Sequence, residues 1–193
     1  MRKFRRDHHL SIQSTYEKGQ WVVGSFGRIE NEEFPSTGFD LGIQYSFHIQ
    51  LESKFGYYLG TLAGYFIELE KRGQRDFGPS SMWKLPGLLG GLVYNYSATG
   101  RVSVGAAGYL SRIVKLSAKG LAGEDEEISV TGETFDYFVS WERFVSLNSA
   151  IKIQYVNHRL WVPPARDAER FALDARIKRF SQGVSLGATY HFL

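Results

Sequence analysis

The sequence predicts an all-β protein, an antiparallel up-and-down transmembrane β-barrel of eight strands, with ten strands as the alternative. Apolar and polar residues alternate in repeated segments, short and long connections alternate between them, and the faces opposite the apolar ones are rich in small residues. The 193 residues are expected to form one domain over residues 1–193. The 21 glycines, 14 phenylalanines and 11 tyrosines are typical of β structure with many turns.

The alternation is clearest over residues 39–51, "FDLGIQYSFHIQL". Side chains along a strand point to opposite faces in turn, so this segment has one apolar face and one polar or small face. The apolar face carries Phe39, Leu41, Ile43, Tyr45, Phe47, Ile49 and Leu51, and the opposite face carries Asp40, Gly42, Gln44, Ser46, His48 and Gln50.

The same period of two returns along the chain. It predicts strands over 55–69, 101–111, 135–142, 149–158 and 180–193, and a further strand over 87–96 in which "LLGG" blurs the period. Two weaker segments, 9–16 and 20–29, predict a hairpin that turns at "EKGQ". These nine segments cannot all span a bacterial barrel with an even strand number, so either 9–16 is not a full strand or one strand is missed.

Connections alternate in length. Short ones are expected near 17–19, 52–54, 97–100 and 143–148, and longer ones near 30–38, 70–86, 114–128 and 162–178. Outer-membrane barrels have short periplasmic turns and long extracellular loops, whereas a soluble sandwich has no reason to alternate in this way.

The polar faces indicate which side of each strand meets lipid. In a soluble protein they would be rich in charged residues, but here they carry glycine, serine and alanine with occasional aromatic rings, which suits the crowded interior of a narrow barrel. We therefore expect the apolar faces to meet lipid and the lumen to be largely filled. A polar network in the lumen is predicted from Arg28, Asp40, His48, Glu68, Arg112, Asp136, Glu142 and Lys152.

Aromatic residues near the predicted short turns suggest a girdle at the membrane interface, where amphipathic rings are favoured. The predicted members are Trp21, Tyr57, Tyr96, Trp141, Tyr190 and Phe192.

The end of the chain carries aromatic and apolar residues at alternate positions, namely Val184, Leu186, Ala188, Tyr190 and Phe192. This pattern resembles the C-terminal signature of Gram-negative outer-membrane β-barrel proteins, although Leu193 follows the aromatic residue on which members of that superfamily typically end. The resemblance implies a place in the bacterial outer membrane and recognition of the last strand by the barrel assembly machinery.

No constellation of catalytic residues emerges, and neither a cofactor nor a metal site is predicted. Two residues after His48 the chain has Gln50, where a His-x-Ser arrangement would have a serine. The net charge of +3 is too small to indicate nucleic acid. The favoured function is a non-enzymatic structural or binding barrel whose partners are outer-membrane lipid, lipopolysaccharide or envelope proteins. A narrow pore for small solutes and a lipid A-modifying enzyme remain as alternatives.

Overall fold

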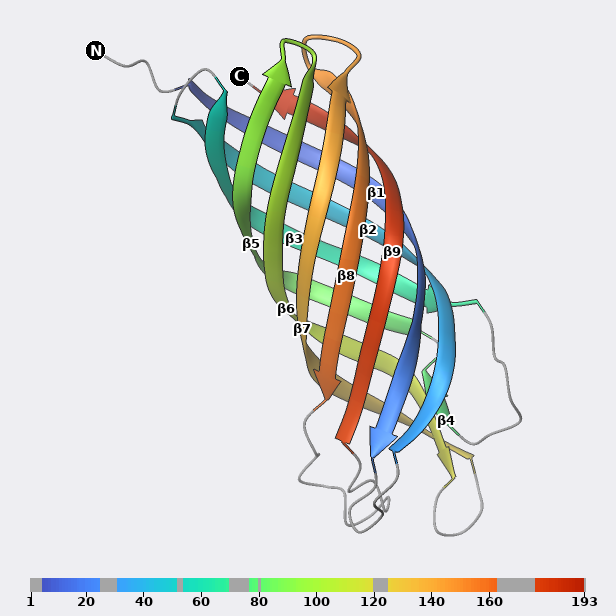
Figure 1. Ribbon diagram of the computed structural model, residues 1–193. Coiled ribbons are helices and arrows are strands. Elements are labelled where there is room, and N and C mark those ends of the chain that lie inside the picture. Colours follow the sequence, from blue (N-terminus) through green and yellow to red (C-terminus); the bar gives the residue numbers. More distant parts are fainter. Residues whose placement is uncertain are drawn as a thin grey trace.

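The computed structural model describes residues 5–24, 31–51, 54–69, 77–79, 81–119, 125–162 and 176–192. Over these residues the chain forms nine strands (Figure 1). They are β1 Arg5–Gly24, β2 Asn31–Gln50, β3 Phe55–Glu68, β4 Phe77–Pro79, β5 Ser81–Ser97, β6 Gly100–Lys119, β7 Asp125–Phe144, β8 Ser149–Val162 and β9 Arg176–Phe192. No helix in these ranges is long and apolar enough to cross a membrane.

The eight long strands close into an antiparallel up-and-down barrel, as predicted. Each pairs with the next long strand along the chain, and the ring closes where β1 pairs with β9, seen in Figure 1 as the blue and red strands side by side. The three-residue strand β4 pairs only with β6, outside this ring. Closure leaves none of these eight long strands at an edge of the sheet, as a membrane-spanning sheet requires.

The connections define two ends of the barrel. At the short-turn end, residues 51–54, 98–99 and 145–148 join β2 to β3, β5 to β6 and β7 to β8. Strand β1 also begins and β9 also ends there (Figure 1). At the opposite end, the loop end, β1 ends at Gly24 and β2 begins at Asn31.

The predicted hairpin at "EKGQ" is wrong, because β1 is one strand of 20 residues. It pairs with β2 without interruption from Arg5 opposite Gln50 to Gly24 opposite Asn31. Glu17 lies inside the barrel and Lys18 outside, so the charged pair follows the alternation of a strand. Merging the two weak segments reduces the nine predicted strands to eight.

Strand β5 begins earlier than predicted, at Ser81, inside the stretch that the sequence suggested was a long loop. A β-bulge lies between Lys84 and Leu88, where three residues of β5 face two of β6. Pro86 lies within this bulge, one of the few places where a sheet tolerates proline. The extra residue moves the inward positions from even to odd numbers, from Lys84 to Leu89 and Val93, which explains the blurred period.

The outer face of the barrel is apolar and the inner face is mixed. Ile43 and Leu186 are 53% and 61% exposed, whereas the neighbouring Gln44 and Ser185 are buried. A water-soluble protein has the opposite arrangement, since its apolar side chains are inside. The apolar faces therefore surround the barrel where lipid would contact it.

Candidate functional site: the filled lumen

The lumen is filled by three successive groups of side chains, whose order can be read along β7. From the short-turn end, the first four buried inward side chains of this strand are Glu142, Ser140, Phe138 and Asp136. Glu142 belongs to a polar cluster at the short-turn end, Phe138 to an apolar plug in the middle, and Asp136 to an ion cluster towards the loop end.

The polar cluster at the short-turn end, here the mouth cluster, consists of His9, His48, Arg101, Glu142 and His191. Arg101 Nε donates to Glu142 Oε2 at 2.8 Å, and its Nη2 donates to His9 Nδ1 at 2.8 Å. His9 Nε2 lies 3.2 Å from His191 Nδ1, and the His9 ring stacks on His48 with centroids 3.7 Å apart. Because His9 Nδ1 accepts from Arg101, a neutral His9 carries its proton on Nε2 and donates it to His191.

A cavity of about 600 Å³ adjoins the mouth cluster at the short-turn end. Its polar lining includes Asp7, His48, Arg101 and His191, and its apolar lining includes Phe144. Val93, which belongs to the apolar plug, also lines the cavity.

The apolar plug consists of Tyr58, Leu89, Val93, Ala107, Tyr109, Phe138 and Val156, all buried. Leu62 packs against it from β3. The rings fit because glycines face them: a Cβ atom added to Gly105 would collide with the Tyr58 hydroxyl and approach Phe138 Cζ to 3.0 Å. Small residues thus leave the space into which large rings of the opposite strands pack.

The ion cluster consists of Glu17, Asp40, Lys84, Asp136, His158 and Arg179, and every member is buried. Glu17 is its centre, with Arg179 Nη1 2.9 Å from Oε2 and His158 Nε2 2.6 Å from Oε1.

Two further carboxylates complete the cluster. Lys84 Nζ contacts Asp40 Oδ2 at 2.6 Å, and His158 Nδ1 lies 2.5 Å from Asp136 Oδ1. The Tyr109 hydroxyl donates to Asp136 Oδ2 at 2.7 Å and so joins the plug to the cluster. Both nitrogens of His158 face carboxylates, an arrangement that a doubly protonated imidazole satisfies. Three carboxylates are then matched by three cations, which offsets the cost of burying each charge.

Glu17, Asp40 and His158 each offer a ligand atom within 4.8 Å of the others, as a metal site would require. However, Arg179 already contacts Glu17 and Lys84 already contacts Asp40. The described side chains therefore balance the buried charge without a metal ion.

The closed barrel, with its apolar outside and polar lumen, has the architecture of the eight-stranded barrels of bacterial outer membranes. Neisserial surface protein A has this fold with a TM-score of 0.54 and 13% sequence identity over 96% of this chain and 97% of that one. This chain has the fold of an eight-stranded outer-membrane β-barrel. Weaker likenesses include the attachment invasion locus protein Ail of Yersinia pestis, with a TM-score of 0.43, 16% identity and coverage of 96% and 98%. They also include OprG of Pseudomonas aeruginosa, with a TM-score of 0.45, 7% identity and coverage of 97% and 95%. No family model and no curated protein sequence matches the chain.

The barrel separates the predicted lumen residues into different groups. Asp40 and Asp136 lie in the ion cluster, whereas Glu142 and His48 lie in the mouth cluster. Lys152 lies between the groups, where its Nζ donates to Gln44 Oε1 at 3.0 Å. Glu68 lies at the loop end and accepts a hydrogen bond from Trp21 Nε1 at 3.4 Å.

Two predicted lumen residues are not among these groups. Arg112 is exposed between buried Ser111 and Ile113, so it faces outward and is not part of the lumen set. The physical reason is the alternation of β6, in which odd-numbered positions point inward. Arg28 lies outside the described residues.

Trp21 corrects the predicted aromatic girdle. It lies inside the barrel at the loop end and is only 3% exposed, because β1 continues through the predicted turn. Its ring packs against the Arg179 guanidinium, 5.6 Å from the ring centroid. The other predicted members lie at the short-turn end, namely Tyr57, Tyr96, Trp141, Tyr190 and Phe192. Trp141 Nε1 donates to the Tyr96 hydroxyl at 2.6 Å on the outer surface. Their role as an interfacial girdle remains a prediction.

The predicted lumen set lacks seven members of the two polar clusters: His9, Glu17, Lys84, Arg101, His158, Arg179 and His191. Arg101 is the first residue of the predicted strand 101–111, and Arg179 directly precedes the predicted strand 180–193, so the alternation of these strands places both side chains on the inward face. Glu17 was not predicted because it lies in "EKGQ", which resembles a turn. Lys84 was not predicted because the bulge after it changes which positions of β5 point inward.

Proposed function

We propose that this outer-membrane barrel is closed to solutes and acts as a structural or binding element through its outer surface, its loops or envelope partners. The observation that supports the proposal best is the apolar plug, whose rings fill the lumen between two polar clusters. Eight-stranded barrels have an interior that side chains can fill, so the plug needs no additional segment of the chain.

A permeating ion would meet two obstacles in this lumen. It would have to displace the buried Tyr58 and Phe138 rings, and it would have to separate the charge pairs around Glu17. Removing one partner of a buried ion pair costs about 3–5 kcal/mol, so spontaneous opening is rare.

The arrangement also favours a non-enzymatic role. The His158 Nε2 atom, which would serve as a general base, lies 2.6 Å from Glu17 Oε1. Ser181 Oγ, near the same cluster, donates to Glu17 Oε2 at 3.0 Å. A nucleophilic serine would need its hydroxyl on the histidine nitrogen, and here Glu17 is the partner of both groups.

Conductance across a planar lipid bilayer tests the proposal. The purified protein should show no stable openings, and Phe138→Ala, which removes a plug ring, should produce more frequent current events. Val139→Ala, at the neighbouring exposed position of β7, is the matched control and should stay silent. Stable openings of porin size from the unmodified protein would establish the pore instead, and altered lipid A masses in cells that express it would establish the enzyme.

A further inference from the structure

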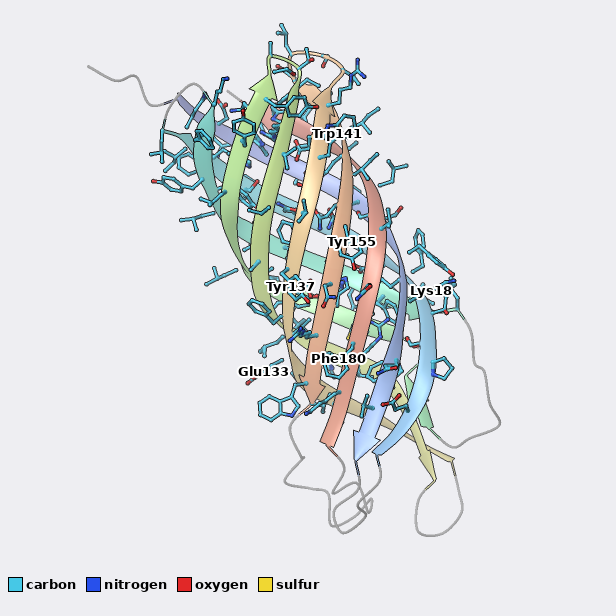
Figure 2. All side chains as sticks on the ribbon, viewed as in Figure 1. Lys18, Glu133, Tyr137, Trp141, Tyr155 and Phe180 are labelled. Carbon is cyan, nitrogen blue, oxygen red and sulfur yellow. The ribbon has the colours of Figure 1, made fainter. Side chains whose placement is uncertain are left out.

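A groove of about 620 Å³ lies on the outer surface of β7, β8 and β9 towards the loop end. Three exposed aromatic side chains line it, namely Phe135, Trp161 and Phe180. Two cations, Arg159 and Lys178, and one carboxylate, Glu133, complete its charged lining. Figure 2 labels Glu133 and Phe180 on this part of the barrel, away from Trp141 near the short turns.

Strand pairing places the groove relative to the apolar band. One row of neighbouring outward residues across β1, β9, β8 and β7 is apolar and aromatic: Tyr16, Val184, Tyr155 and Val139. The next row towards the loop end is largely polar: Lys18, Gln182, Asn157 and Tyr137. On these four strands, a row of apolar and aromatic residues is therefore followed towards the loop end by a largely polar row.

The groove lies directly beyond this polar row. In the next row Phe180, Arg159 and Phe135 are neighbours, and in the row after that Lys178, Trp161 and Glu133 are neighbours. Because long loops of outer-membrane barrels are extracellular, we expect these rows to meet the headgroup region of the outer leaflet. Aromatic and cationic side chains thus alternate where lipid headgroups contact the barrel.

The cations of the groove are available to an anion. Arg159 Nη2 donates to the Tyr137 hydroxyl at 3.4 Å, and its guanidinium lies 5.5 Å from the centroid of that ring. Among the described residues, neither Arg159 nor Lys178 pairs with a carboxylate. With Glu133 counted, the groove carries one net positive charge.

We propose that this groove binds the phosphorylated glycolipid of the outer leaflet, the lipid A part of lipopolysaccharide. Arg159 and Lys178 bind its phosphate, since guanidinium and ammonium groups are strong donors to phosphate oxygens. Phe135, Trp161 and Phe180 contact the sugar and the upper part of the acyl chains, because their rings suit a boundary between apolar and wet surroundings. The inference rests on the proposed binding role of the outer surface, and it does not depend on whether the lumen is closed.

Binding of purified lipid A to the barrel in phosphatidylcholine nanodiscs tests the proposal. Lipid A should bind, and Arg159→Gln or Lys178→Gln should each weaken binding about tenfold, the loss expected for one charge-assisted hydrogen bond. Arg143→Gln is the matched control, because Arg143 is exposed on β7 at the short-turn end and should have no effect. Heat-modifiable gel mobility shows that each variant is folded, and both substitutions are at exposed positions.

Two further lipids identify the chemistry that is recognised. Dephosphorylated lipid A should bind at least tenfold more weakly than lipid A, and phosphatidylglycerol should not compete at equal concentration. Equal binding of the dephosphorylated lipid, equal competition by phosphatidylglycerol, or unchanged binding by both groove variants would each overturn the proposal. None of these results alters the conductance measurement, so a failure here is distinct from a failure of the closed lumen.

Discussion

At the scale of single residues, the buried charges of the lumen depend on partners from distant parts of the chain. Glu17 is 0% exposed and contacts cations that follow it by 67, 141 and 162 positions, on β5, β8 and β9. An ion buried at such a depth is tolerated only where its partners are already in place. The cluster therefore stabilises the closed barrel and not any single strand.

Glu17→Gln tests this dependence. The substitution keeps the size of the side chain but removes the charge that faces Arg179, His158 and Lys84. We expect the free energy of unfolding to fall by about 3–5 kcal/mol, because cations are left buried without a carboxylate. Urea unfolding followed by heat-modifiable gel mobility measures the change. Glu33→Gln, at an exposed position of β2, should shift stability by less than about 1 kcal/mol, and equal effects of the two variants would argue against the cluster.

At the scale of strands, side chains point alternately to the lipid-facing side and to the lumen, and this decides which substitutions each position tolerates. Along β2, Ile43 is 53% exposed on the outer face, whereas Gln44 is buried and accepts a hydrogen bond from Lys152. The strand therefore has a lipid-facing side that excludes charge and a lumen side that uses polar groups.

Ile43→Arg and Gln44→Ala test the two sides of β2. The arginine should lower stability by about 2–4 kcal/mol if position 43 lies near the membrane midplane. The alanine should cost about 1 kcal/mol, since Lys152 loses one hydrogen bond. Reconstitution into vesicles followed by urea unfolding compares the variants, with Ile43→Leu as the control for side-chain shape. A larger cost at position 44 than at position 43 would mean that the odd-numbered face points inward.

The continuity of strand β1 through Gly19 can also be tested by mutation. A Cβ atom at Gly19 would collide with the backbone of Phe180 and Ser181 on β9, so Gly19→Ala should destabilise the barrel by about 1–3 kcal/mol. At Gly108 an added Cβ would meet no atom within 4 Å, which makes Gly108→Ala the matched control. If position 19 were in an exposed turn, both substitutions would be equally mild in urea unfolding.

At the scale of the whole molecule, the barrel has a polar interior and an apolar exterior. This distribution is compatible with a membrane because each of the eight long strands is paired on both sides, so the outer face can meet lipid. Closure of the ring brings the first and last strands together, with Ile12 opposite Ala188 and Tyr16 opposite Val184.

Detergent dependence and heat-modifiable mobility test the architecture as a whole. We expect the protein to stay in the membrane fraction until detergent is added and to migrate differently in gels with and without boiling, because the closed barrel resists dodecyl sulfate. A monodisperse preparation without detergent would contradict the membrane assignment.

The sequence by itself determined the class of fold, the two faces of most strands and three of the four short connections, those near 52–54, 97–100 and 143–148. These features follow from a period of two that each strand carries locally, as residues 39–51 illustrate. Only the tertiary structure decided that "EKGQ" continues a strand, that Pro86 lies in a bulge and that Trp21 points inward. The physical reason is that these features depend on contacts between residues far apart in the sequence. Glu17 is stable inside the barrel because Lys84, His158 and Arg179 neutralise its charge, and these partners come from strands that meet only when the barrel closes.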